Sequence, residues 1–354
     1  MSRSTAPLAV LARETPGLAV TVALSLLLLV PGGHSQAQES AAGAATTLDH
    51  FSERLESELV LREVWQGELA MTDYYPLDYA LNAHHEVAAE LRPGPPGSED
   101  RRLVEFTAIG GSHSIGSEVL PGEDTELESV LDGAVVAFRD SKDTRLLEGR
   151  EEAELLLAGL RDGFDRGAFG PPEDLGDEPS WTLHDAEALS LFDATGSLGR
   201  EFEDLMEPAR EVIVLSAAFE LRALLAGDET PRADLKLTRV EPDARTPHDE
   251  PLTLELKADG VSDLLPQLER LANQGGDDSL WDGVTKLEAT WSLEAKGEAA
   301  WDTERRVLHG IQLEGELTVT AELTFQPNNP ALDSNTFVLD IEGTVSLNSE
   351  HLRE

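Results

Sequence analysis

Apolar and polar residues alternate one by one in three long stretches near the carboxyl end of the chain. Because the side chains of a β-strand point to opposite faces in turn, a period of two predicts strands with one buried and one solvated face. Glu, Thr, Ser or Lys fills nearly all the positions between the apolar ones, so three long antiparallel strands are predicted. The apolar positions are Leu287, Ala289, Trp291, Leu293, Ala295, Gly297, Ala299 and Trp301, then Ile311, Leu313, Gly315, Leu317, Val319, Ala321, Leu323 and Phe325, and then Leu339, Ile341, Gly343, Val345 and Leu347.

Shorter segments of the same character predict further strands in the rest of the chain. Residues 48–58 are predicted to form a short helix before the first of these strands. Both ends of the chain contribute strands, which predicts one or more curved antiparallel sheets. The shorter strands are expected at 59–72, 103–109, 134–140, 144–147, 235–240 and 252–257.

The middle of the chain has a different pattern. Residues 151–161 combine acidic residues in a first turn with a leucine-rich face, which favours a helix. Apolar residues recur at spacings of three and four within 198–226, as on one face of a helix. We predict a helical insertion at about 151–226 and a C-terminal β-sheet at about 232–350. The predicted fold class is therefore α+β, with sheet from both ends of the chain and a helical middle segment.

Length bounds the number of domains without deciding it. We interpret residues 48–350 as a single α+β domain, although two β lobes joined by the helices fit the length equally well. A chain of this size buries enough surface to form a stable core without covalent cross-links.

Each of the three long stretches carries a glycine at an inward-facing position, namely Gly297, Gly315 and Gly343. A missing side chain lets a strand bend sharply or lets another backbone approach closely. These glycines are candidates for lining a ligand groove. The alternative is that they only avoid crowding in a packed core, and the sequence leaves both open.

The N-terminus has the order of features found in a secretory signal peptide. Arg3 and Arg13 precede an apolar run at 18–30, which is too short to span about 30 Å of hydrocarbon comfortably. A Pro-Gly-Gly breaker and small residues follow. Residues 1–37 are therefore predicted to be a signal peptide and residues 38–47 a disordered lead-in, which places the mature protein in the periplasm or outside the cell.

Composition narrows the classes of partner. The chain has no cysteine, which excludes disulfides, thiolate metal sites and the lipid-attachment cysteine of a lipoprotein, so no membrane anchor is expected. Acidic residues number 69 against 27 basic ones, a net charge of −42. Such a charge repels nucleic acid and anionic membranes. The partners that remain are a small apolar ligand or an envelope protein.

The densest cluster of metal-ligand residue types is His84, His85 and Glu86, with His113 nearby in sequence. A zinc-protease helix needs a second histidine at position 89, which is Ala89, so that motif fails. In a strand, His84 and Glu86 share one face and His85 takes the other. These residues are weak metal candidates, and solvated or hydrogen-bonded histidines are the alternative.

No other motif passes a spacing check. The Gly-Gly-Ser-His-Ser-Ile-Gly run at 110–116 lacks the glycine on both sides of a serine that a nucleophile elbow requires. Carboxylates are so abundant that chance pairs carry no meaning for a glycosidase dyad. We therefore expect no catalytic residue and no cofactor-binding residue, and no cofactor beyond weak binding of divalent cations.

Residues 301–317, which run from Trp-Asp to Leu-Glu-Gly-Glu-Leu, resemble the strand–turn–strand signature of a group of secreted bacterial proteins common in planctomycetes. Residues 171–181 and 261–266 are similar to two further stretches of that group. The resemblance implies export and a β-rich fold, and it implies no activity. One departure is that Arg305 or Arg306 stands where the group has its turn glycine.

These observations favour a non-enzymatic envelope or extracellular protein that binds an apolar or small ligand between sheet and helices. One alternative is a metal-assisted hydrolase that uses His84, His85 or Glu86 together with His113. The other alternative is a structural or protein-interaction module.

Overall fold

The computed structural model describes most of the chain beyond residue 47, and residues 45–354 form one compact unit. The predicted signal peptide and lead-in lie outside the described residues. The described residues are 48–66, 78–117, 123–139, 143–150, 153, 164, 166–173, 175–176, 178–192, 219–228, 230–240, 249–266, 268–269, 283–326 and 335–353.

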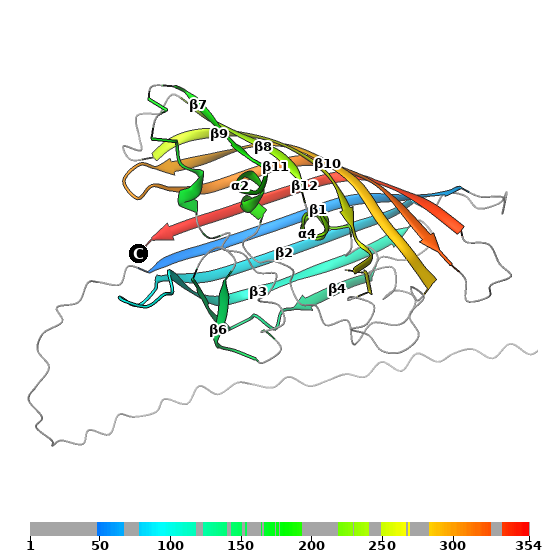
Figure 1. The fold of residues 1–354 in the computed structure, drawn as a ribbon, viewed down its shortest axis with the longest axis horizontal. Coiled ribbons are helices and arrows are strands. Elements are labelled where there is room, and N and C mark those ends of the chain that lie inside the picture. The colour runs from blue at the N-terminus through cyan, green and yellow to red at the C-terminus, as the bar shows by residue number, and fades with distance from the viewer. Residues whose placement is uncertain are drawn as a thin grey trace, which may run out of the picture. The chain divides into compact units, whose positions relative to one another are not determined.

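Twelve strands of the described chain form a single antiparallel sheet, in which they lie side by side as one twisted layer (Figure 1). Their order is β6-β5-β3-β2-β1-β12-β11-β10-β9-β8-β7, and β4 pairs with β3 off this path. The strands are β1 (Asp49–Gln66), β2 (Asp78–Pro93), β3 (Arg102–Ser117), β4 (Glu123–Glu128), β5 (Val135–Phe138), β6 (Thr144–Glu148), β7 (Ser180–His184), β8 (Arg232–Arg239), β9 (Asp249–Asp263), β10 (Val284–Asp302), β11 (Val307–Phe325) and β12 (Asn335–Arg353).

The two ends of the described chain pair with each other at the centre of the sheet. β1 runs antiparallel to β12 from Asp49 opposite Arg353 to Gln66 opposite Thr336. This pairing joins the N-terminal strands β1–β6 to the C-terminal strands β7–β12. The prediction that both ends of the chain contribute antiparallel strands is confirmed, and the structure joins these strands in one sheet.

The predicted α+β class with a helical middle is wrong, because the protein is mostly β. Within 151–226 the described residues contain strand β7, the short helices α2 (Asp185–Leu189) and α4 (Leu221–Gly227), and the 3-10 turns η2 (Arg166–Phe169) and η3 (Ser190–Phe192). The expected helix at 151–161, and most of the one at 198–226, lie outside the described residues apart from a few positions.

The physical reason for this error is that the described residues of this segment pack against the apolar face of the sheet as one strand and several short pieces. β7 is the edge strand of the sheet and pairs with β8, and the other described pieces are short helices and turns that place apolar side chains on the sheet. Tertiary contact with the apolar face thus outweighs local helix preference.

The predicted helix at 48–58 is also wrong, because these residues belong to β1. Phe51, Leu55 and Leu59 are buried at a spacing of four, which looks helical in the sequence. The inward positions between them hold Glu53 and Ser57, which are buried polar residues. Every second residue of this stretch is therefore buried, but the hydropathy pattern does not show it because two of the buried residues are polar.

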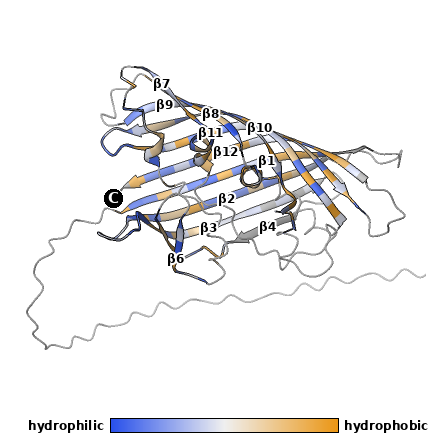
Figure 2. Ribbon diagram, viewed as in Figure 1, coloured by the Kyte–Doolittle hydropathy of each residue, from blue (hydrophilic) through white to orange (hydrophobic). Residues whose placement is uncertain are grey.

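The alternation in the three long C-terminal strands is confirmed. Along β10 every second residue from Leu287 to Ala295 is buried, and the residues between are exposed. Figure 2 shows apolar and polar residues following one another along these strands. The sheet thus has one apolar face, called the inner face, and one polar face, called the outer face.

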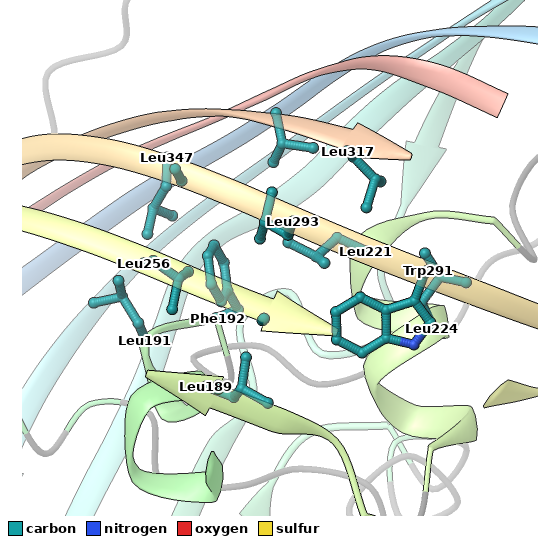
Figure 3. Packing of buried hydrophobic residues seen from close by; sticks show 14 of the residues in the cluster. Leu189, Leu191, Phe192, Leu221, Leu224, Leu256, Trp291, Leu293, Leu317 and Leu347 are labelled. Atoms are coloured by element: carbon teal, nitrogen blue, oxygen red, sulfur yellow. The ribbon is translucent and has the colours of Figure 1, made fainter. Parts of the chain in front are cut away.

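Short helical segments cover the inner face. Phe192, Leu191 and Leu221 are almost fully buried there, and each contributes about 1.5–3 kcal/mol by leaving water. Figure 3 shows the labelled side chains of α2, η3 and α4 close to leucines and Trp291 of the strands. The labelled residues of this larger core are Leu189, Leu191, Phe192, Leu221, Leu224, Leu256, Trp291, Leu293, Leu317 and Leu347.

A second, smaller core lies at the β3 and β5 side of the inner face. Phe164 is its centre, with its ring 4.9 Å from the Phe51 ring and 6.1 Å from the rings of Phe106 and Phe138. All of these contacts are edge-on, the arrangement that aromatic quadrupoles favour. The inner face therefore carries two separate apolar clusters.

The three inward glycines lie on a diagonal across neighbouring strands. Gly297 is opposite Leu313, Gly315 is opposite Ala295, and Gly343 is opposite Leu317, a shift of two residues at each step. A Cβ on Gly297 would lie 2.8 Å from the Leu313 Cα, and one on Gly315 would lie 2.7 Å from the Glu294 carbonyl oxygen. The neighbouring backbones take up this space, so these glycines allow close approach of strands.

We expect Gly343→Ala to lower the free energy of unfolding by about 2 kcal/mol, as overpacking does. The added Cβ would meet the Glu58 carbonyl oxygen and lie 2.7 Å from the Leu59 Cα. Urea unfolding measures the change. Thr344→Ala, at the exposed neighbouring position of the same strand, should cost less than about 1 kcal/mol. Equal losses in the two variants would contradict the close approach.

Candidate functional site

Polar side chains cross the inner face between the two apolar clusters. Glu53 on β1 is 2% exposed and lies between Phe51 of the smaller core and Leu55 of the larger core. Buried groups of this kind are rare unless they are paired. We call the set the polar seam, and its members are Glu53, His85, Arg166, Glu220, Arg222 and Ser349.

One carboxylate of the polar seam holds two arginines. Glu53 Oε2 accepts a hydrogen bond from Arg166 Nη2 at 2.9 Å, and Glu53 Oε1 accepts one from Arg222 Nη2 at 2.6 Å. Arg166 also donates to the carbonyl of Leu191, and Arg222 Nε donates to the carbonyl of Phe192, each at 3.2 Å. A single strand residue therefore fixes η2, η3 and α4 against the sheet.

A second charged contact of the polar seam joins β2 to α4. His85 Nε2 lies 2.9 Å from Glu220 Oε2, and Glu220 is the residue that precedes α4. Gly111 on β3 is opposite His85, and a Cβ there would lie 3.3 Å from His85 Nδ1. The glycine of the 110–116 run thus leaves room for a buried imidazole.

We call the short segments α2, η3 and α4 on the inner face the cover. The polar seam positions the cover more than it stabilises it. Buried ion pairs gain little net free energy, but removal of one partner costs about 3–5 kcal/mol because a charge is left in an apolar place. Helices of five and seven residues, such as α2 and α4, do not persist in water by themselves. Charged anchors and apolar packing together decide where these short helices lie.

The structure separates the predicted metal candidates. His84 lies on the outer face, 3.6 Å from Glu56 and 3.7 Å from Glu86, whereas His85 lies on the inner face with Glu220. His113 is opposite Ala83 in the pairing of β2 with β3. Among the residues described, no group of three His, Asp or Glu is arranged to hold a metal ion.

A hollow of about 750 Å³ lies on the outer face. Gly315 contributes to it, but eight of the fourteen lining residues are glutamates or lysines, so the hollow is lined mainly by charged residues. Glu294 is directly opposite Glu316 across the β10–β11 pair, an arrangement of like charges that opposes pairing. The charged lining residues are Glu56, Glu58, Glu255, Lys257, Glu294, Lys296, Glu314 and Glu316.

A second hollow of about 180 Å³, which we call the arginine pocket, lies at the end of the sheet where β1 begins. It collects residues from β1, β3, η2, the β10–β11 turn and the end of β12. Because these segments are far apart in the chain, no local motif reveals the pocket. Its lining residues are Asp49, Arg102, Phe164, Arg166, Gly167, Arg305, Arg306, Val307 and His351.

The His351 imidazole reports the electrostatics of the arginine pocket. Burial lowers its pKa, and the positive charges of Arg102 and Arg166 lower the pKa further. Asp49, whose Oδ2 lies 3.7 Å from His351 Nε2, acts in the opposite direction and only partly offsets this. The neutral imidazole is therefore the form that the fold favours.

Comparisons with known proteins add little. No family model and no curated protein sequence matches the chain. The structure of Pseudomonas aeruginosa OccK7 (OpdD) covers 88% of this chain and 100% of its own, at 10% identity and a TM-score of 0.13. That of Acinetobacter baumannii OccAB4 covers 87% and 99%, at 8% identity and a TM-score of 0.12. Likeness at this level supports no conclusion about fold or function.

In the described part of the chain, no helix combines the length and the apolar character needed to cross a bilayer.

We expect Glu53→Gln to lower the free energy of unfolding by about 3 kcal/mol, because Arg166 and Arg222 lose the carboxylate they share. Chemical unfolding followed by tryptophan fluorescence measures the change. Glu58→Gln removes an equal charge from the exposed face of the same strand and should change stability by less than about 0.5 kcal/mol. Similar effects of the two substitutions would show that the polar seam does not anchor the cover.

We expect His351 to make folding less favourable in acid. Its pKa in the folded protein lies below the value of about 6.5 in the unfolded chain, so the unfolded state binds more protons over that interval. Stability is full above about pH 6.5 and declines as the pH falls toward the lower folded value. His351→Gln should therefore lose less stability between pH 7 and pH 5, as measured by thermal unfolding. Parallel curves for variant and wild type would contradict this.

Proposed function

We propose that this protein is a non-enzymatic binding protein that holds an apolar ligand against the inner face of the sheet, under α2, η3 and α4. The observation that carries the proposal is the make-up of the cover. Short helical segments, and not a second sheet or a long helix, lie on a broad apolar face in the described part of the chain (Figure 3). Concave apolar surfaces with a few placed polar groups are the usual form of a ligand site.

The side chains of the cover take the place that an apolar ligand would take. Phe192 and Leu191 belong to the cluster that also holds Leu256, Leu293 and Leu347 of the strands. If the cover moves away, these strand residues become exposed to water, which is unfavourable at about 25 cal/mol per Å². A bound apolar ligand restores that burial. Because the ligand binds only the open form, its binding shifts the protein from the closed form to the open form.

Polar contacts hold α4 on the sheet together with the buried Leu221 and Leu224. Ser262 Oγ on β9 donates to the Leu224 carbonyl at 2.6 Å and accepts from Trp291 Nε1 at 2.9 Å. The polar seam supplies the other attachments through Glu220 and Arg222. Water replaces polar partners readily when a cover opens, whereas an unpaired apolar face needs a ligand.

The predicted leader and the resemblance to secreted proteins support a location in the periplasm or outside the cell. The metal-assisted hydrolase has no converging set of ligands among the described residues, since His84 and His85 lie on opposite faces. A structural or protein-interaction module is the outcome if no ligand binds.

A disulfide across the cover tests the proposal, because the natural chain has no cysteine. A Cβ on Gly227 of α4 would lie 3.2 Å from the Ser262 Cβ, close to the ~3.5–4.5 Å of a disulfide. In the Gly227→Cys/Ser262→Cys variant, the disulfide of the oxidised form holds α4 on the sheet. We expect this form to bind a fluorescent long-chain fatty acid about tenfold more weakly than the reduced form, because the closed state does not bind the ligand.

The comparison of oxidised with reduced protein uses one and the same variant, so any cost of the substitutions cancels. Gly227→Cys alone should show no effect of oxidation. Equal affinity in both redox states would show that the ligand does not enter under α4. Absence of binding by wild-type protein, with no apolar compound extracted from it, would overturn the proposal.

A further inference from the structure

Three segments far apart in the chain bring arginines to the arginine pocket, and a fourth brings an imidazole. Arg102 begins β3, Arg166 begins η2, Arg305 and Arg306 lie in the β10–β11 turn, and His351 is near the end of β12. Across the whole sequence, acidic residues outnumber basic ones by 69 to 27. Four guanidinium groups around one hollow therefore contrast sharply with the rest of the molecule.

The carboxylates of the lining are too few to neutralise these four arginines. Asp49 is the one acidic residue among the described lining residues. Two further acids lie beside the pocket, where Glu53 pairs with Arg166 at 2.9 Å and Asp302 pairs with Arg305 at 3.4 Å. Glu53 also pairs with Arg222, so one carboxylate there serves two arginines. Among the described lining residues, four arginines therefore stand against one carboxylate.

Arg166 gives the pocket a fixed charge with little freedom to move. It is 1% exposed, and its guanidinium carbon lies 5.5 Å from the Phe51 ring centroid and 5.8 Å from that of Phe169. Phe164 forms an apolar part of the lining beside it. Charges next to apolar walls act more strongly on a ligand than charges in water do.

Arg306 occupies a strained backbone position at the edge of the same pocket. Its φ is +57°, in the left-handed region that glycine adopts at low cost and arginine does not. Its amide donates to the Asp302 carbonyl, which closes the turn, and no partner for its guanidinium is found among the described residues. Non-glycine residues in this region gather at ligand sites, where function outweighs the strain.

We propose that the arginine pocket binds a phosphoryl oxyanion, either inorganic phosphate or the phosphate group of an ester. A carboxylate is satisfied by one or two guanidinium forks, whereas a phosphoryl group offers three or more oxygens and up to two charges. The hollow of about 180 Å³ holds roughly six waters at about 30 Å³ each, enough for a phosphoryl group and part of its carrier.

This site is separate from the proposed apolar site. The lining of the pocket shares no residue with α2, η3 or α4, and Arg166, which also donates to the Leu191 carbonyl of η3, is the contact between the two. Failure of one proposal therefore leaves the other standing.

Calorimetric titration of the mature protein with inorganic phosphate and, separately, with glycerol 3-phosphate tests the site, in a buffer free of phosphate and sulfate. We expect Arg306→Gly to weaken binding about tenfold or more, the loss of a charge-assisted hydrogen bond. Its melting temperature should be no lower than that of wild type, because glycine accepts a φ of +57°. Arg306→Lys keeps the charge and should bind better than Arg306→Gly.

Arg54→Gln is the matched control, since Arg54 is an exposed arginine that pairs with Glu56 on the outer face. It should leave the affinity for phosphate unchanged. Binding of inorganic phosphate supports free phosphate as the ligand, and binding of glycerol 3-phosphate alone supports an ester. Binding of neither compound, equal binding of acetate, or equal affinity in wild type and Arg306→Gly would overturn the proposal.

Discussion

Burial of one face of a large antiparallel sheet is the constraint on which the rest of this structure depends. β1 and β12 join two sets of strands into one layer, so the inner face runs without a break across both halves of the chain. A single sheet has no second sheet to cover it, and apolar side chains left in water would destabilise the fold. Short helical segments between β6 and β8 supply the described cover, and their positions are the part of the fold that relates to ligand binding.

Charged groups under that cover give it a defined place. Apolar contacts between leucines are non-directional, and a seven-residue helix such as α4 has several ways to lie on a leucine surface. Glu53 and His85 select one of these positions, because each pairs with a specific charged side chain from the segment above it. The same groups make an open cover tolerable, since water solvates them once they are exposed.

Charge is sorted by location in this acidic protein. The outer face carries rows of glutamates with a few lysines, which keep it solvated. Four arginines gather at the end of the sheet, where Arg306 holds a backbone conformation that suits glycine. The structure places its side chain beside three other arginines.

The sequence by itself determined the long strands and the face each one buries, because alternation such as that from Leu287 to Trp301 depends only on neighbouring positions. It misplaced β1, since buried Glu53 and Ser57 interrupt the apolar pattern and leave a spacing of four. It also misjudged the middle segment, whose described residues form one strand and short helical pieces on the sheet. Only the tertiary structure decided the polar seam and the arginine pocket. Both join residues more than a hundred positions apart, and local patterns carry no information on which distant charges meet.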